Sequence, residues 1–97
     1  MKYIAFWEMK PEDFPKVIAK FRKRTEAGME NLLGAGLKTI FGPYHVGLET
    51  KGFTVLETDN PVELANYSNY YMPELPMKIY PINDSNEMIA SWDKYHK

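Results

Sequence analysis

The sequence contains no cysteine among its 97 residues. A disulfide therefore cannot supplement the core, and thiolate nucleophiles and cysteine-based zinc sites are excluded. An excess of charge of one sign is also missing, because 12 Lys and Arg stand against 13 Asp and Glu, for a formal net charge of −1. This balance argues against a nucleic-acid partner and against an anionic membrane surface. The lack of cysteine fits a reducing compartment, and we expect a cytoplasmic protein.

Long hydrophobic runs and histidines are scarce as well. No run approaches the roughly 20 apolar residues of a membrane helix, and the apolar run from Tyr3 to Trp7 is too short for a signal peptide and ends at Glu8. The two histidines, His45 and His96, lie far apart in the sequence and have no cysteine beside them. We therefore expect no membrane partner, no bound metal and no cofactor.

What the sequence does contain is the pattern of one small folded domain. Hydrophobic residues make up 44% of the chain, an ordinary globular proportion, and we expect one domain over residues 1–97. Apolar periodicity predicts the order β-α-β-β-α-β followed by one further helix. The strands are expected at residues 3–7, 38–46, 53–58 and 77–82, and the helices after the N-caps Asp13, Asn60 and Asp84.

This order predicts an α+β domain of the ferredoxin-like type. Two β-α-β crossovers joined by a hairpin give a four-stranded antiparallel sheet with both helices on one face and an extra C-terminal helix. Within the second strand, Gly42-Pro43 predicts a bulge or an edge position. The second helix is expected to start with Asn60 as N-cap, Pro61 at the first helical position and Glu63 completing a capping box.

Both faces of the expected sheet are apolar. In the first strand Tyr3, Ala5 and Trp7 point one way, while Ile4 and Phe6 point the other way. A sheet with one face in water alternates apolar and polar residues, so the second face also needs a cover. We expect a homodimer that pairs two sheets; the alternative is a monomer whose last helix covers its own sheet.

Several motifs carry a family resemblance that covers most of the chain and is best from Thr39 to Ile89. The motifs are Gly42-Pro43-Tyr44-His45-Val46, Gly52-Phe53, Glu57-Thr58-Asp59-Asn60-Pro61 and Pro81 in the last strand. The chain resembles small uncharacterised proteins of the dimeric α+β barrel superfamily. That resemblance implies a ferredoxin-like fold with two sheets facing each other across a dimer. Better known members include cofactor-free monooxygenases, muconolactone isomerase and haem-degrading enzymes, but no catalytic set carries over to this sequence.

Four residues are candidates for a site. His45 is the candidate catalytic acid/base, because imidazole titrates near neutral pH; the alternative is a structural histidine. Trp7, Tyr44 and Tyr67 are candidate ligand-binding residues, since aromatic rings with a polar tip suit a flat apolar ligand. The alternative for these rings is the core or a dimer interface.

A basic run on the first helix is interpreted as a solvated face, because nearby acids balance its charge. The run comprises Lys16, Lys20, Arg22, Lys23 and Arg24. The alternative is a phosphate or nucleic-acid contact.

Three functions remain open at this point. The preferred hypothesis is a dimeric protein that binds a small apolar or aromatic compound in a pocket between sheet and helices. The second is a cofactor-independent enzyme of the monooxygenase or isomerase kind with His45 as acid/base, and the sequence leaves open whether the protein is an enzyme. The third is a structural or interaction protein that dimerises through its sheet.

Overall fold

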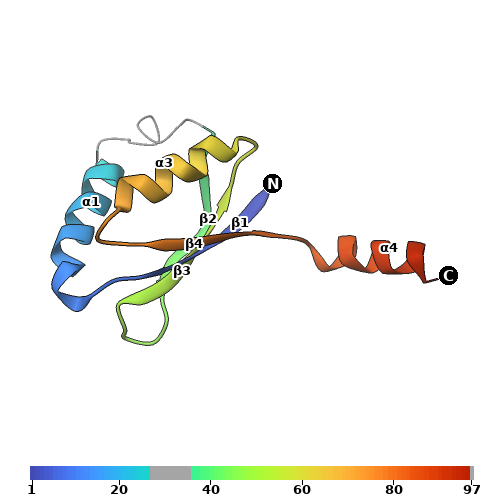
Figure 1. Cartoon of the computed structure of the whole chain (residues 1–97), viewed down its shortest axis with the longest axis horizontal. Helices are drawn as coiled ribbons and strands as arrows, with labels where there is room; N and C mark the ends of the chain where they lie inside the picture. The colour runs from blue at the N-terminus through green and yellow to red at the C-terminus, as the bar shows by residue number, and fades with distance from the viewer. Residues whose placement is uncertain (27–35, 97) are drawn as a thin grey trace.

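The computed structural model describes residues 1–26 and 36–96, which form a small α+β domain (Figure 1). The element order expected from the sequence is confirmed, with one short 3-10 helix added before the first α-helix. The strands are β1 (Lys2–Glu8), β2 (Lys38–His45), β3 (Lys51–Glu57) and β4 (Met77–Ile82). The helices are η1 (Pro11–Asp13), α1 (Phe14–Glu26), α3 (Pro61–Tyr71) and α4 (Ser85–Tyr95).

The four strands form a single antiparallel sheet in the order β2-β3-β1-β4. Helices α1 and α3 lie side by side on one face of this sheet (Figure 1). The sheet order follows from the connections, because β1-α1-β2 and β3-α3-β4 each join two parallel strands that are separated by one antiparallel neighbour. The two helices therefore cross the same face and enclose the core against it.

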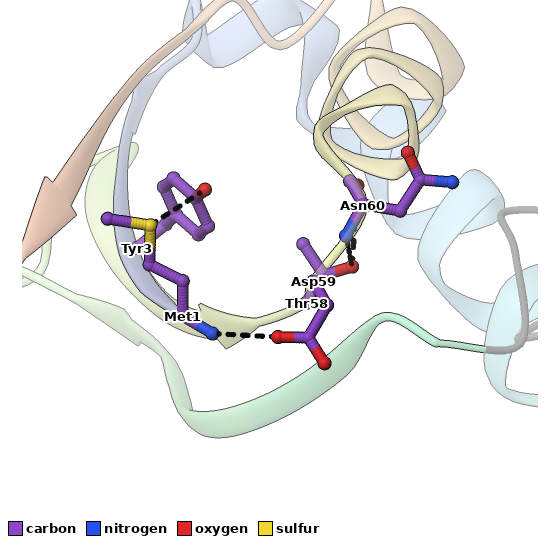
Figure 2. A network of polar contacts seen from close by, with 5 residues as sticks. All are labelled: Met1, Tyr3, Thr58, Asp59 and Asn60. Atoms are coloured by element: carbon purple, nitrogen blue, oxygen red, sulfur yellow. Dashed lines mark hydrogen bonds and ion pairs between the residues drawn. The ribbon is translucent and has the colours of Figure 1, made fainter.

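The start of α3 confirms half of the predicted capping arrangement. Asn60 is the N-cap, and its side-chain oxygen accepts the Val62 backbone N–H at 3.1 Å, with Pro61 in the first turn. The reciprocal half is wrong: the Asn60 N–H donates to the Thr58 hydroxyl at 3.0 Å instead of to Glu63 (Figure 2). Thr58, two residues before the N-cap, replaces the glutamate because the chain bends at Asp59 between β3 and α3.

The other two helix starts differ from each other. Asp84 caps α4 as predicted, with its carboxylate accepting the Asn86 N–H at 2.7 Å. Helix α1 begins at Phe14, directly after Asp13, as predicted, but Asp13 is the last residue of η1 and not an N-cap outside a helix, because η1 runs directly into α1.

The beginning of β1 is attached to the corner that follows β3. The ammonium group of Met1 lies 3.3 Å from the Asp59 carboxylate, and the Tyr3 hydroxyl lies 3.3 Å from the Met1 sulfur (Figure 2). The Thr58 backbone N–H donates to the Met1 carbonyl at 3.0 Å. These contacts continue the β1–β3 pairing by one residue beyond the strands.

The register divides the sheet side chains between two faces. On the helix side, Ala5 opposes Thr54 and Trp7 opposes Gly52, and all four residues are buried. The core on this side consists of Ala5, Trp7, Met9, Val17, Leu37, Leu56, Tyr67, Tyr71 and Leu75. The opposite side, called the open face below, carries Ile4, Phe6, Phe41, Tyr44, Phe53, Val55 and Tyr80.

Helix α4 does not cover the open face. It extends from the end of β4 away from the rest of the domain (Figure 1). No residue of α4 is buried, and its apolar stripe is exposed: Met88, Ile89, Trp92 and Tyr95. The alternative in which the last helix covers its own sheet is therefore not the arrangement in this structure.

Among residues 1–26 and 36–96, no helix is long and apolar enough to cross a membrane. Within the same residues, no three His, Cys, Asp or Glu side chains gather where they could hold a metal ion.

Candidate ligand pocket

A cavity of about 150 Å³ lies between the helices and the sheet. Strands β1, β2 and β3 supply its floor, and helices α1 and α3 supply its walls. Most of the lining is apolar, with a few polar groups among the rings, which is the usual composition of a small-molecule site. The lining residues are Trp7, Met9, Phe14, Val17, Ile18, Phe21, Arg24, Pro43, His45, Thr54, Tyr67, Tyr71 and Leu75.

Trp7 is fixed at the floor of this pocket by a hydrogen bond and by a glycine. Its indole N–H donates to the Thr54 hydroxyl at 3.1 Å, so its buried polar atom is satisfied. Gly52 lies opposite Trp7 on β3, where an added Cβ would stand 2.7 Å from two indole carbons and overlap the Tyr44 carbonyl oxygen. The lack of a side chain at Gly52 therefore gives the indole its place against the sheet.

The register shifts in β2 decide which of its side chains reach the pocket. Phe41 opposes Val55 and Tyr44 opposes Phe53, so β2 carries one extra residue between these pairs. This confirms the bulge predicted at Gly42-Pro43, where Gly42 has φ 92.

Beyond the bulge the strand alternates normally, so the adjacent candidates Tyr44 and His45 separate. Tyr44 faces Phe41 and Phe53 on the open face, with ring centroids 4.7 and 6.2 Å away. His45 opposes Gly52 and lines the pocket. The structure thus brings together Trp7, His45 and Tyr67 but leaves Tyr44 outside, because neighbouring strand residues point to opposite faces.

His45 stands at the exposed rim of the pocket. Its ring centroid lies 5.0 Å from Trp7 in an edge-on arrangement and 5.9 Å from Phe14. Its Nδ1 lies 2.8 Å from the Glu49 carbonyl oxygen, which can only accept, so Nδ1 carries a hydrogen. In the neutral ring the remaining nitrogen, Nε2, is then the acceptor.

Tyr67 and Tyr71 form the buried end of the pocket on α3. They are one turn apart, with ring centroids 5.4 Å from each other. Burial raises the pKa of Tyr67, and burial also raises the pKa of Tyr71 to about 12. Both hydroxyls therefore stay protonated near neutral pH and can donate hydrogen bonds to a ligand.

Arg24 and Tyr71 are pocket residues that the sequence analysis did not single out. Arg24 was assigned to a solvated basic face, yet its guanidinium carbon lies 5.0 Å from the centre of the Tyr67 ring. A signal was present, because Arg24 follows Val17 by seven residues and Phe21 by three, the spacing of one helix face. The positive charge of Arg24 instead favoured its interpretation as a solvated residue.

Comparison with known families identifies the chain. The family described as a domain of unknown function, DUF3303, matches residues 1–96. The chain belongs to the DUF3303 family. No curated protein and no solved structure matches it significantly. Membership in DUF3303 assigns no ligand or activity, so the pocket itself has to supply the functional argument.

Proposed function

We propose that this DUF3303 protein binds a small apolar or aromatic compound in the pocket between its sheet and its helices. The observation that carries the proposal is the convergence of Trp7, His45 and Tyr67 on one cavity of about 150 Å³. Cavities of this size accommodate a benzene ring. The polar tips at its rim and its end, His45 and Tyr71, would orient such a ring.

A pocket-filling variant tests the binding proposal. Ile18, half-buried on α1, lines the cavity, so Ile18→Trp is expected to occupy it. With benzyl alcohol as the neutral probe, we expect calorimetric titration to detect binding to the wild type and no binding to Ile18→Trp. The matched control is Ile89→Trp on exposed α4, which should bind as the wild type does. Equal binding by all three proteins would place the probe elsewhere and reject the proposal.

We further propose that the protein works as a homodimer, with the ferredoxin-like fold and the paired sheets of a dimeric α+β barrel. Support comes from the open face, where Phe6, Phe41 and Tyr80 are each about half exposed and none of the described helices covers them. The apolar stripe of α4, which is exposed, offers a second surface for a partner copy. Apolar surfaces of this kind mark interfaces between proteins.

A charge placed on the open face tests the dimer. Phe6 lies on the central strand β1, between Phe53 of β3 and Lys78 of β4. We expect native mass spectrometry to find a dimer for the wild type and a monomer for Phe6→Glu, because a buried unpaired carboxylate is costly. The control Leu48→Glu changes an exposed residue of the β2–β3 hairpin and should stay dimeric. A monomeric wild type would remove the dimer from the proposal and leave the pocket.

A second candidate function is catalysis with His45 as the acid/base. The specific observation is that Glu49 fixes the Nδ1 hydrogen and leaves Nε2 as the basic atom beside the pocket. An enzyme of this kind predicts that His45→Ala abolishes turnover of an aromatic substrate while benzyl alcohol still binds. Unchanged turnover in His45→Ala would exclude the catalytic role and leave the binding role in place.

A further inference from the structure

Among the described residues, one side chain that lines the pocket, Arg24, is permanently charged, and no described side chain of opposite charge pairs with it. No carboxylate is among the described residues that line the cavity. Within the described part of the chain, no carboxylate lies within the 4.0 Å ion-pair distance of Arg24. Lys20, one turn earlier on α1, differs in this respect, because its ammonium nitrogen lies 2.8 Å from the Glu74 carboxylate. Of these two α1 cations, Lys20 is paired with a carboxylate, and Arg24, which lines the pocket, is paired with none that the structure describes.

The groups around Arg24 are neutral and able to donate hydrogen bonds. Tyr67 lies under the guanidinium, and Tyr71 is close enough for the Arg24 charge to oppose the rise in its pKa. Burial keeps both phenols protonated, so they add hydroxyl donors without adding negative charge. Glu63, one turn before Tyr67, lies beside Gly36 and does not neutralise Arg24 by an ion pair.

The apolar remainder of the pocket suits a ring. The Trp7 indole forms the floor, and the Phe14 ring lies beside His45 at the rim. An apolar body would contact these side chains, while a group at its end would meet the guanidinium. Guanidinium presents a planar fork of donors that matches a carboxylate and forms charge-assisted hydrogen bonds with it.

We infer that the ligand of this pocket is a small aromatic acid, with its ring on Trp7 and its carboxylate on Arg24. This inference rests on the proposed function, because it names the class of compound that the same pocket selects. A benzylic ammonium ion would place a second cation beside Arg24, and a neutral ring would leave the guanidinium without a counter-charge. The pocket therefore selects the acid over the ammonium ion and the neutral ring, because only the acid pairs with the Arg24 charge.

The experiment compares three probes of one shape and different charge. Benzoate, benzamide and benzylammonium are titrated into the wild type, Arg24→Gln and Lys23→Gln by calorimetry. Lys23→Gln removes the same charge from the neighbouring, exposed position of α1 and is the matched control. We expect the wild type to bind benzoate about tenfold more tightly than benzamide, as for one charge-assisted hydrogen-bonded contact, and benzylammonium most weakly.

The variants then locate the effect. Arg24→Gln should weaken benzoate binding about tenfold and change benzamide binding by less than about twofold, whereas Lys23→Gln should keep the wild-type preference. Retained benzamide binding also shows that Arg24→Gln is folded. Equal binding of benzoate and benzamide by the wild type would overturn the inference and leave the proposed pocket standing. Failure of all three probes to bind the wild type would overturn the inference together with the proposed function.

Discussion

Both faces of the sheet carry apolar side chains, but helices α1 and α3 cover only one of them (Figure 1). Phe6 and Trp7 are neighbours on β1, yet Phe6 is 47% exposed and Trp7 only 6%. On the helix face the ring has a fixed place, with a hydrogen bond to Thr54 and with Gly52 beneath it. On the open face, the ring centroids of Phe6 and Tyr80 lie 6.2 Å apart, and both rings are about half exposed in the part of the chain that the structure describes.

Hydrophobicity alone does not define the core of this domain. Strand residues were apolar on both sides, and only the position of α1 and α3 determines which side is buried. The helix face uses its rings to enclose a cavity with polar groups inside it. The open face presents its rings to whatever covers it, which in our proposal is a second copy.

Removing one ring from the helix face should have the largest effect on stability. Trp7→Ala deletes a buried indole and leaves the Thr54 hydroxyl without its donor. We expect a loss of about 3–5 kcal/mol in the free energy of unfolding, measured by urea denaturation. The control is Trp92→Ala on α4, where the ring is 62% exposed.

Measured in the monomeric Phe6→Glu background, where no partner copy can cover α4, the control should cost less than about 0.5 kcal/mol, as for most surface substitutions. A similar loss in both variants would mean that α4 is packed in solution as firmly as the helix face, and the contrast between the two regions would disappear. The two variants also separate the fluorescence of the two tryptophans, so the buried one can be followed alone.

Much of the fold was predictable because its signals are local. The alternation of apolar residues located the strands, and short polar side chains before Pro61 and Ser85 located two helix starts. The glycine and proline at 42 and 43 predicted the bulge. Each of these depends on residues within a few positions of one another, so a single sequence suffices.

The candidate site was less predictable for two reasons. It depends on which face of the sheet each β2 residue occupies, and it depends on helices that are distant in the sequence packing side by side. Tyr44 and His45 looked equivalent in the sequence, and only the register shift in β2 separates them. Arg24 looked solvated, since its placement requires α3 to pack beside α1. The direction of α4, which extends away from the domain with no residue buried (Figure 1), was also not predictable, because periodicity locates a helix but does not say what it packs against.

A smaller effect is expected from a methyl group at the point where β2, β3 and Trp7 approach most closely. Gly52→Ala would place its Cβ against the Tyr44 carbonyl oxygen and 2.7 Å from the Trp7 indole. We expect a loss of about 1–3 kcal/mol, the usual range for overpacking a core, together with a changed near-ultraviolet circular dichroism signal from Trp7. Wild-type stability in Gly52→Ala would show that the indole does not lie against β3.

The buried tyrosines of the helix face should make the stability of the domain depend on pH in the alkaline range, whereas the exposed tyrosines of the open face should not. Burial raises the pKa of Tyr71 to about 12, so the folded state holds its proton more tightly than the unfolded state, whose tyrosine pKa is about 10. The stability from this group is fully present below pH about 10 and is lost as the pH rises toward about 12. Urea denaturation at increasing pH checks this.

The variant Tyr71→Phe should flatten the alkaline decline in stability, because it removes the phenol that ionises on unfolding. Tyr80→Phe alters a ring on the open face and should leave the Tyr71 transition in place. An alkaline decline that is unchanged in Tyr71→Phe would contradict the burial of this hydroxyl beside Arg24.

The smallest effect is expected at the ion pair that joins α1 to the segment after α3. The Lys20 ammonium lies 2.8 Å from Glu74 and 3.0 Å from the Met72 carbonyl oxygen. A hydrogen bond from Lys20 lowers the pKa of Glu74. The ionised carboxylate therefore stabilises the fold above its unfolded pKa, and this stabilisation is lost as the pH falls through its folded pKa.

In Lys20→Met, an NMR titration should find the Glu74 pKa raised toward its ordinary value. Lys16→Met provides the control, since Lys16 contributes the weakest of the effects on Glu74. An unshifted Glu74 pKa in Lys20→Met would show that the Lys20 hydrogen bond is not what lowers the pKa of this carboxyl, and that the ion pair contributes nothing to the contact between α1 and the segment after α3.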